Sequence, residues 1–144
     1  MKNTILLTMV LFSIGVMPLR VVAEDFDGSK GLMCSCMQVI ECIPEGNCTK
    51  ATAEKIGIPQ FLSINFEKMT ISAPLWGETQ TPSRIENLKR IDGKLILQGA
   101  EDGYREARDG TGWSIAISEE TGKMVLTESG EQAAFVAFGA CIPR

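Results

Sequence analysis

Apolar and polar residues alternate along the chain from Phe61 to near the C-terminus, and this pattern constrains the fold more than any other feature of the sequence. Within 61–66 every second residue is large and apolar, and a similar alternation returns in 113–118 and 123–127. A period of two indicates a β-strand with one buried face. Asp92-Gly93, which separates two such segments, is a strong signal for a two-residue hairpin turn.

These strands follow one another at short spacing and are separated by turn residues, which is typical of an antiparallel meander. We therefore predict an all-β fold that closes into an approximately eight-stranded, lipocalin-like barrel with one short helical turn over 52–57. An eight-stranded barrel is either filled by side chains or just wide enough for one small ligand, and the sequence leaves both open. The predicted strands are 32–43, 61–66, 69–73, 84–91, 94–98, 113–118, 123–127 and 133–141.

The N-terminus has the organisation of a secretory signal peptide. Lys2 precedes the apolar run 5–17, and Ala23 offers a small residue for cleavage. The apolar run is shorter than the roughly 20 residues that span a bilayer. We expect a signal peptide over 1–23, a flexible leader over 24–31 and a single β-barrel domain over 32–144. The mature protein would then be secreted or periplasmic, and it would not be held in the membrane.

The mature chain would be acidic. Residues 1–23 contain Lys2, Arg20 and no acid, so their removal leaves 12 basic and 18 acidic residues and a formal net charge of −6. A negative surface argues against nucleic acid and against anionic lipid as partners.

Five cysteines, all in the expected mature chain, predict two disulfides and one unpaired thiol in an oxidising compartment. Cys42 and Cys48 bracket a Pro-Glu-Gly-Asn turn and can meet across it. Cys141 lies near the C-terminus and can bond Cys34 or Cys36 at the start of the first strand, so that the two chain ends are joined. We take Cys34 as the candidate partner and Cys36 as the candidate free thiol, although the spacing permits either pairing.

The segment Met33-Cys34-Ser35-Cys36-Met37 also has the sulfur donors that Cu(I) prefers. A soft-metal or redox protein that uses the Cys34 and Cys36 pair is therefore an alternative. On a strand, however, the thiols and the methionines face opposite sides. We favour the structural role, and predict neither a metal site nor a cofactor.

The absence of histidine excludes Ser-His and Cys-His nucleophilic machinery and histidine-ligated metals. Carboxylate pairs can hydrolyse glycosides without histidine. Glu41, Glu86, Glu101 and Glu128 are available, but none lies in a recognisable motif. The sequence therefore favours a protein that is not an enzyme and has no catalytic residue to name.

Two loops are candidates for binding. The loop 74–83 carries Leu75 and Trp76 between prolines, and these two residues are our predicted binding residues. An aromatic anchor on a restricted loop is typical of a binding hot spot, but Trp76 could instead fold back and cap the barrel. The loop 100–112 mixes acidic and basic residues, which is typical of a solvated loop.

Several stretches resemble a family of small secreted bacterial proteins that has no assigned activity. The resemblance rests on Cys42 and Cys48, on 61–68, on 113–124 and on 138–141, and it covers most of the mature chain. These motifs are hairpin and cystine features, so they imply a β-rich, disulfide-containing fold and no site residues. The barrel outline is also similar to lipocalin-like binders and to envelope inhibitors of lysozyme, although the lipocalin Gly-x-Trp signature is absent.

These observations favour an exported, non-catalytic binding module for a small apolar ligand or a protein partner. An envelope inhibitor of a lysozyme or protease, acting through exposed loops, is the alternative. A ligand-binding protein should have an unfilled interior, whereas an inhibitor should have a filled barrel and an exposed loop.

Overall fold

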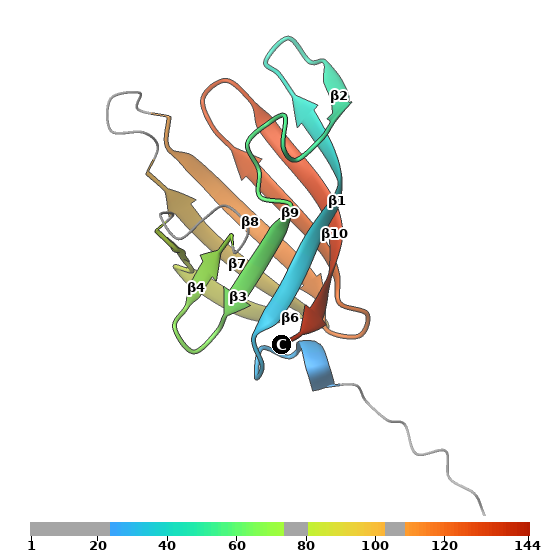
Figure 1. The fold of residues 1–144 in the computed structure, drawn as a ribbon, viewed down its shortest axis with the longest axis vertical. Helices are drawn as coiled ribbons and strands as arrows, with labels where there is room; N and C mark the ends of the chain where they lie inside the picture. The colour runs from blue at the N-terminus through green and yellow to red at the C-terminus, as the bar shows by residue number, and fades with distance from the viewer. Residues whose placement is uncertain (1–23, 74–80, 103–108) are drawn as a thin grey trace, which may run out of the picture.

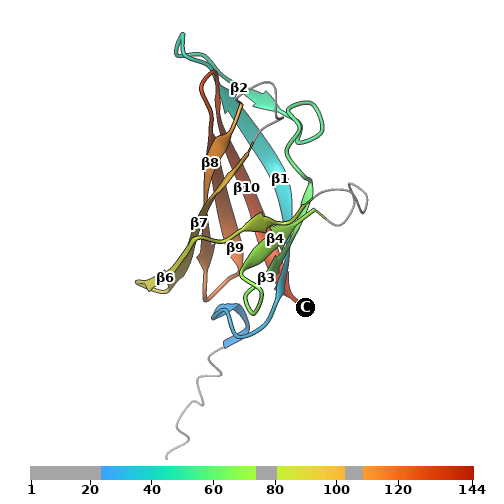
Figure 2. The same cartoon turned by 90° about the vertical axis from the view of Figure 1, so that its left-hand side faces the viewer.

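The computed structural model of the protein describes residues 24–73, 81–102 and 109–144. These residues form an antiparallel, strongly curved β-sheet with a barrel-like shape (Figures 1 and 2). The all-β fold predicted from the alternation is therefore confirmed. No helix in the described ranges is long and apolar enough to cross a membrane.

The described residues contain a short 3₁₀ helix, η1 (Glu24–Phe26), and ten strands. In the sheet the strands follow the order β5-β4-β3-β1-β10-β9-β8-β7-β6. The strand β2 lies off this path and pairs with the C-terminal part of β1. The strands are β1 (Leu32–Cys42), β2 (Cys48–Ala51), β3 (Phe61–Asn65), β4 (Thr70–Ser72), β5 (Ser83–Arg84), β6 (Asn87–Ile91), β7 (Lys94–Glu101), β8 (Thr111–Ser118), β9 (Lys123–Ser129) and β10 (Ala134–Pro143).

A single segment of chain, 83–91, connects the two ends of this strand order. Its first part, β5, pairs with β4, and its last part, β6, pairs with β7. Between them, the backbone N–H of Ile85 donates to the Met69 carbonyl oxygen at 2.9 Å, and that of Glu86 donates to the Gln98 carbonyl oxygen at 2.9 Å. The segment therefore hydrogen-bonds to both ends of the sheet.

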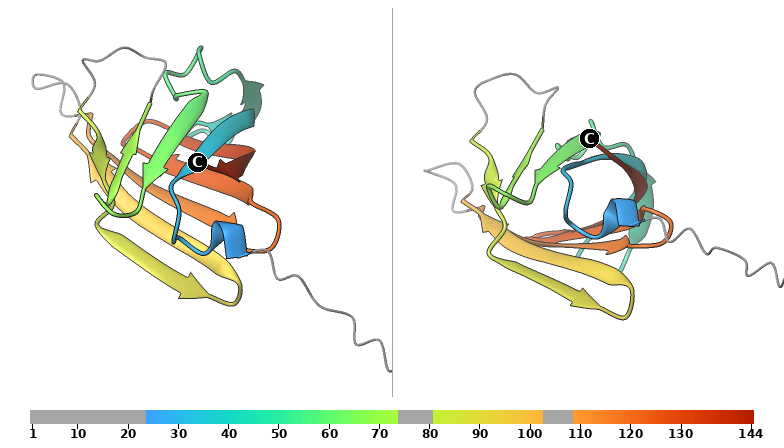
Figure 3. Two further views of the ribbon diagram at one scale, coloured as in Figure 1. Left: turned by 60° about the horizontal axis from the view of Figure 1, so that its bottom comes forward. Right: turned by 90° about the horizontal axis from the view of Figure 1, so that it is seen from below.

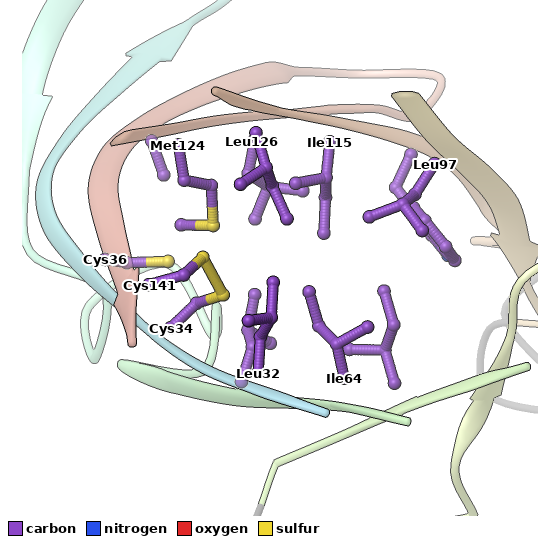
Figure 4. Packing of buried hydrophobic residues seen from close by; sticks show 14 of the residues in the cluster. Leu32, Cys34, Cys36, Ile64, Leu97, Ile115, Met124, Leu126 and Cys141 are labelled. Carbon is purple, nitrogen blue, oxygen red and sulfur yellow. A yellow bond between two sulfur atoms is a disulfide. The ribbon is translucent and has the colours of Figure 1, made fainter. Parts of the chain in front are cut away.

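The inward-facing residues of the strands pack closely across the interior, and Ile115 lies where this packed region meets the cavity described below. Leu32 and Ile64 point toward Leu97, Ile115 and Met124 from the opposite side (Figure 4). All five side chains are at most 1% exposed. This close packing is what the alternation of apolar residues produces when each strand turns the same face inward.

The 3₁₀ helix η1 lies at the filled end of the barrel. In the view from below it sits within the outline of the curved sheet, and the C-terminus lies nearby (Figure 3). Phe26 packs against the core, and its ring occupies the space beside Gly122, where a Cβ atom would lie 2.5 Å from the ring. The backbone N–H of Arg144 donates to the Gly31 carbonyl oxygen at 2.8 Å, which ties the last residue to this end.

Two disulfides join the cysteines. Cys34 bonds Cys141, its direct neighbour across β1 and β10, and Cys42 bonds Cys48 across the β1–β2 hairpin. The structure thus decides between the two pairings that the sequence left open, because Cys36 lies opposite Gly139 and remains a free, buried thiol.

Two local predictions differ from the structure in detail. The single helical turn expected over 52–57 is present as a hydrogen-bonded turn and is not part of a helix: the Thr52 hydroxyl accepts from the Lys55 backbone N–H at 3.3 Å, and the Ile56 N–H donates to the Thr52 carbonyl oxygen at 3.4 Å. Gly57, with a φ of 74°, ends the turn as expected. The strand count was also low, because β2 was missed and the predicted strand 84–91 is divided into β5 and β6.

Candidate functional site

A cavity of about 520 Å³ opens at the end of the barrel away from η1. Register places it there: Trp113 at the start of β8 lines the cavity, whereas Ile117 near the end of β8 belongs to the packed region. Its apolar walls come from β3, β4, β8 and β9, namely Leu62, Ile71, Trp113, Ile115 and Leu126. Among the described residues, the interior is therefore packed near η1 and recessed at the opposite end.

The Trp113 ring is held in the cavity wall by two features of its neighbours. Its indole N–H donates to the Ser83 hydroxyl at 3.0 Å, which joins β8 to β5. Gly99 lies opposite Trp113 on β7, and a Cβ atom there would overlap both the ring and the Arg84 carbonyl oxygen. The absence of a side chain at position 99 therefore lets the ring lie against β7 and β5.

Carboxylates gather at the mouth of the cavity. Glu101, Asp102 and Glu128 line it, while Arg84 is the one basic residue among its described lining residues. The Thr111 hydroxyl donates to Glu128 Oε1 at 2.8 Å, and Thr111 pairs with Glu101 across β7 and β8. Burial raises the pKa of the Glu128 carboxyl, the nearby Glu101 charge adds to the effect, and the Thr111 hydrogen bond opposes it.

A second recess, of about 460 Å³, lies between β1 and the loop that follows β2. Cys36 and Val39 line it from β1, and Ala53 and Ile58 line it from the loop. Cys36 is 4% exposed, and burial raises the pKa of its thiol to about 11. At neutral pH it is therefore a protonated thiol, which is the unreactive form.

The structure gives little support for a metal site at the sulfur-rich segment. Cys34 is disulfide-bonded, so the Cys34 and Cys36 pair offers a single thiol. Within the described ranges, no three His, Cys, Asp or Glu residues are grouped so that they could hold a metal ion.

The predicted binding residues, Leu75 and Trp76, lie outside the described residues. The described residues nearest to them in sequence, Ala73 and Thr81, both line the cavity. Of the mixed-charge loop, Glu101 and Asp102 are described and also line the cavity, while 103–108 lies outside the described residues.

Sequence reasoning missed Trp113 and Glu128 as cavity residues. Glu128 lies in no recognisable motif, but it follows Met124 and Leu126 at intervals of two and so shares their inward face. Glu101 follows Leu95 and Leu97 in the same way. A carboxylate in phase with the buried face of a strand was the signal that could have found both.

Comparison with known proteins adds no family to this description, since the sequence matches no protein-family model and no curated protein significantly. The resemblance to small secreted bacterial proteins therefore stays a prediction.

Proposed function

We propose that the protein is an exported, non-catalytic binding module that holds a small ligand in the cavity of a closed, lipocalin-like barrel. The observation that carries the proposal is the cavity itself. Its volume of about 520 Å³ lies within the range of small-molecule sites, roughly 300–1,000 Å³. Small-molecule sites are mostly apolar with a few polar groups. This cavity has apolar side chains in its walls, but more of its accessible lining is polar than apolar.

The cavity between the described strands also favours a ligand over the alternative of an envelope inhibitor. A protein inhibitor needs no space inside the barrel and would bind through its loops. The loop residues that an inhibitor would use, Leu75 and Trp76, lie outside the described part of the chain. The cavity supports the ligand-binding function without them.

The charges at the mouth indicate what kind of ligand would fit. Among the described lining residues, three carboxylates stand against a single guanidinium, and the apolar walls include Leu62, Ile71 and Leu126. An apolar molecule with a positively charged amine would bury its chain against these walls and place the amine beside Glu128 and Glu101. We therefore propose an organic amine with an apolar body as the ligand class.

Isothermal titration with octylamine and octanoate tests this proposal, because the two probes have similar chains and opposite charges. We expect octylamine to bind about tenfold more tightly, since hydrogen bonds to charged groups contribute about 1.5–3 kcal/mol and 1.4 kcal/mol is tenfold. Glu128→Gln should remove most of this preference. The matched control Glu120→Gln, in the exposed turn between β8 and β9, should leave it unchanged.

Failure to bind either probe would contradict a ligand-binding cavity. Equal binding of both probes, with no effect of Glu128→Gln, would leave the cavity as a site for apolar ligands but contradict the amine.

A second candidate function rests on the same carboxylates. Retaining and inverting glycosidases use one protonated and one ionised carboxyl group, and Glu128, with its raised pKa, lies in the same cavity as Glu101. Release of nitrophenol from a set of nitrophenyl glycosides would reveal such an activity. It would have to disappear in both Glu128→Gln and Glu101→Gln, because each carboxyl group has its own step in the reaction.

A further inference from the structure

The outer face of the sheet carries a row of apolar residues that the core does not use. Ile96, Ala116, Val125 and Phe138 are direct cross-strand neighbours on β7, β8, β9 and β10. Each alternates with buried residues of its own strand, so all four point outward. The row ends at the bulge of β1, where Met37 is 72% exposed.

Two further apolar side chains extend this face along β1 and β10. Phe138 is 43% exposed and Ile142, on the same side of β10, is 65% exposed. Met33 pairs with Ile142 across β1. Large apolar side chains that are adjacent and exposed usually mark a surface that contacts something else. We call the surface formed by Met33, Met37, Ile96, Ala116, Val125, Phe138 and Ile142 the outer apolar face.

Lysines surround the outer apolar face. Lys123 pairs with Ala140 across β9 and β10. Lys50 pairs with Ile40 across β2 and β1, and Ile40 pairs with Val136 of β10. Because Ala140 and Val136 lie on either side of Phe138, a lysine is found in both directions along β10. Lys89 pairs with Ile96 at the other end of the apolar row. None of these three lysines has a carboxylate within salt-bridge distance in the described part of the chain.

The acidic residues of the same strands are elsewhere. In β1, β2 and β6–β10, all of which are described, the carboxylates are Glu41, Glu101 and Glu128. Glu101 and Glu128 face the cavity, and Glu41 pairs with Phe135, which packs against the core. Other carboxylates lie in the turns that join these strands, namely Glu45, Asp92, Glu119, Glu120 and Glu131. Of these, Asp92 faces Lys94 and Glu119 pairs with Arg90. An acidic protein therefore has one face that is basic and apolar.

We propose that the outer apolar face docks on an anionic lipid surface. The charge complementarity argues against a second copy of the chain, because a dimer through this face would bring lysines of both copies together, while the carboxylates of these strands face the cavity or the core. It also favours lipid over an acidic protein, since Trp, Tyr and Arg dominate protein hot spots and lysine is depleted there. Lysine beside Phe and Met is instead typical of surfaces that lie in the headgroup region, where the long stem reaches the phosphates.

This proposal does not depend on the ligand cavity. It differs from the expectation, based on the negative net charge, that the protein does not bind anionic lipid. At physiological salt a charge acts over about 8 Å, so the lysines at the contact outweigh the carboxylates that face the cavity. The membrane would be a peripheral contact of the exported protein.

Flotation with lipid vesicles tests the proposal. The protein is recovered after export, oxidised, and mixed with vesicles of phosphatidylcholine or of equal parts phosphatidylcholine and phosphatidylglycerol. We expect binding to the anionic vesicles alone, and loss of binding between about 0.1 M and about 1 M salt, where the screening length falls from about 10 to about 3 Å. Lys123→Gln should weaken binding about fivefold, as expected for one lysine near an anionic surface.

Lys68→Gln is the matched control, because Lys68 is exposed in the β3–β4 turn and its loss changes the net charge equally. Phe138→Ser removes apolar contact without changing charge, and it should also weaken binding, whereas Thr127→Ser on the same face should not. Equal effects of Lys123→Gln and Lys68→Gln would show that net charge alone matters and would overturn the proposal. Absence of binding to both kinds of vesicle would also overturn the proposal, whether the protein stays monomeric, self-associates or binds only an acidic protein.

Discussion

At the scale of single residues, the position of Trp113 in the cavity wall depends on the absence of a side chain at Gly99. The ring of Trp113 lies where a side chain at position 99 would be, and its N–H reaches Ser83. Alternation in 113–118 predicted that Trp113 faces inward. It could not predict that the ring lines a cavity, because that depends on the distant residues Ser83 and Gly99.

Gly99→Ala should destabilise the fold by about 1–3 kcal/mol, the usual cost of adding a methyl group to a packed site. Gly112→Ala is the control, since no atom lies within 4 Å of a Cβ built at that position. Urea unfolding of the two variants measures the difference. A Gly99→Ala protein as stable as Gly112→Ala would contradict the close approach of Trp113.

Cys36 should not react with iodoacetamide in the folded protein at neutral pH, because it is buried and its thiol pKa is raised to about 11. In denaturant without reductant, mass spectrometry should detect one alkylated cysteine out of five. Rapid labelling of the folded, unreduced protein would show that Cys36 is accessible or that the disulfides are different.

Glu128 should make the fold less stable as pH rises. Because burial raises its pKa above the usual 4.5, the folded protein holds this proton more tightly than the unfolded chain. The stabilising contribution of Glu128 to the free energy of unfolding is therefore fully present below about pH 4.5, and it is lost as pH rises through the raised pKa. Glu128→Gln should melt at a higher temperature than the natural protein at pH 7, with less difference at pH 4. An unchanged pH dependence, equal to that of Glu120→Gln, would contradict a buried, destabilised carboxylate.

At the scale of elements, the sequence was most informative where a strand has one buried and one exposed face. The strands β3, β8 and β9 were predicted to within a few residues for this reason. The strand β2 was missed because Cys48–Ala51 has no alternation and is mostly exposed. Its pairing depends on the hairpin that the Cys42–Cys48 disulfide closes.

The segment 83–91 shows a second limit. Its residues indicate one strand, and the chain is continuous, yet it pairs with β4 at its start and with β7 at its end. Which partners a strand finds is decided by the whole sheet, so local pattern alone could not predict this division.

The two disulfides should differ in how much they stabilise the fold. On the loop-entropy model, the Cys34–Cys141 bond, with a sequence separation of 107, contributes about 4–5 kcal/mol, and the Cys42–Cys48 bond, with a separation of 6, contributes about 2 kcal/mol. Denaturant unfolding of Cys34→Ala/Cys141→Ala and of Cys42→Ala/Cys48→Ala measures both. Equal losses would mean that the first bond does not act by joining the chain ends.

At the scale of the whole molecule, the two ends of the barrel-like sheet differ. Phe26 packs against the core at one end, whereas the cavity lies at the other, among Glu101 of β7, Trp113 of β8 and Glu128 of β9. The barrel-like fold could be predicted from the period of two together with the cysteines at both ends of the chain. That the interior is packed at one end and recessed at the other could not, because it depends on which side chains meet across the sheet.

The proposed function places the ligand in that cavity, and its location can be observed directly. The most direct measurement is a titration of the ¹⁵N-labelled, oxidised protein with octylamine, followed by amide and indole chemical shifts. We predict saturable shifts of the Trp113 indole N–H and of the amides of Ile71, Glu101 and Glu128, with little change at Leu32 and Met124 in the packed region. Shifts confined to the outer apolar face, or no saturable shift at Trp113, would contradict a ligand-binding cavity.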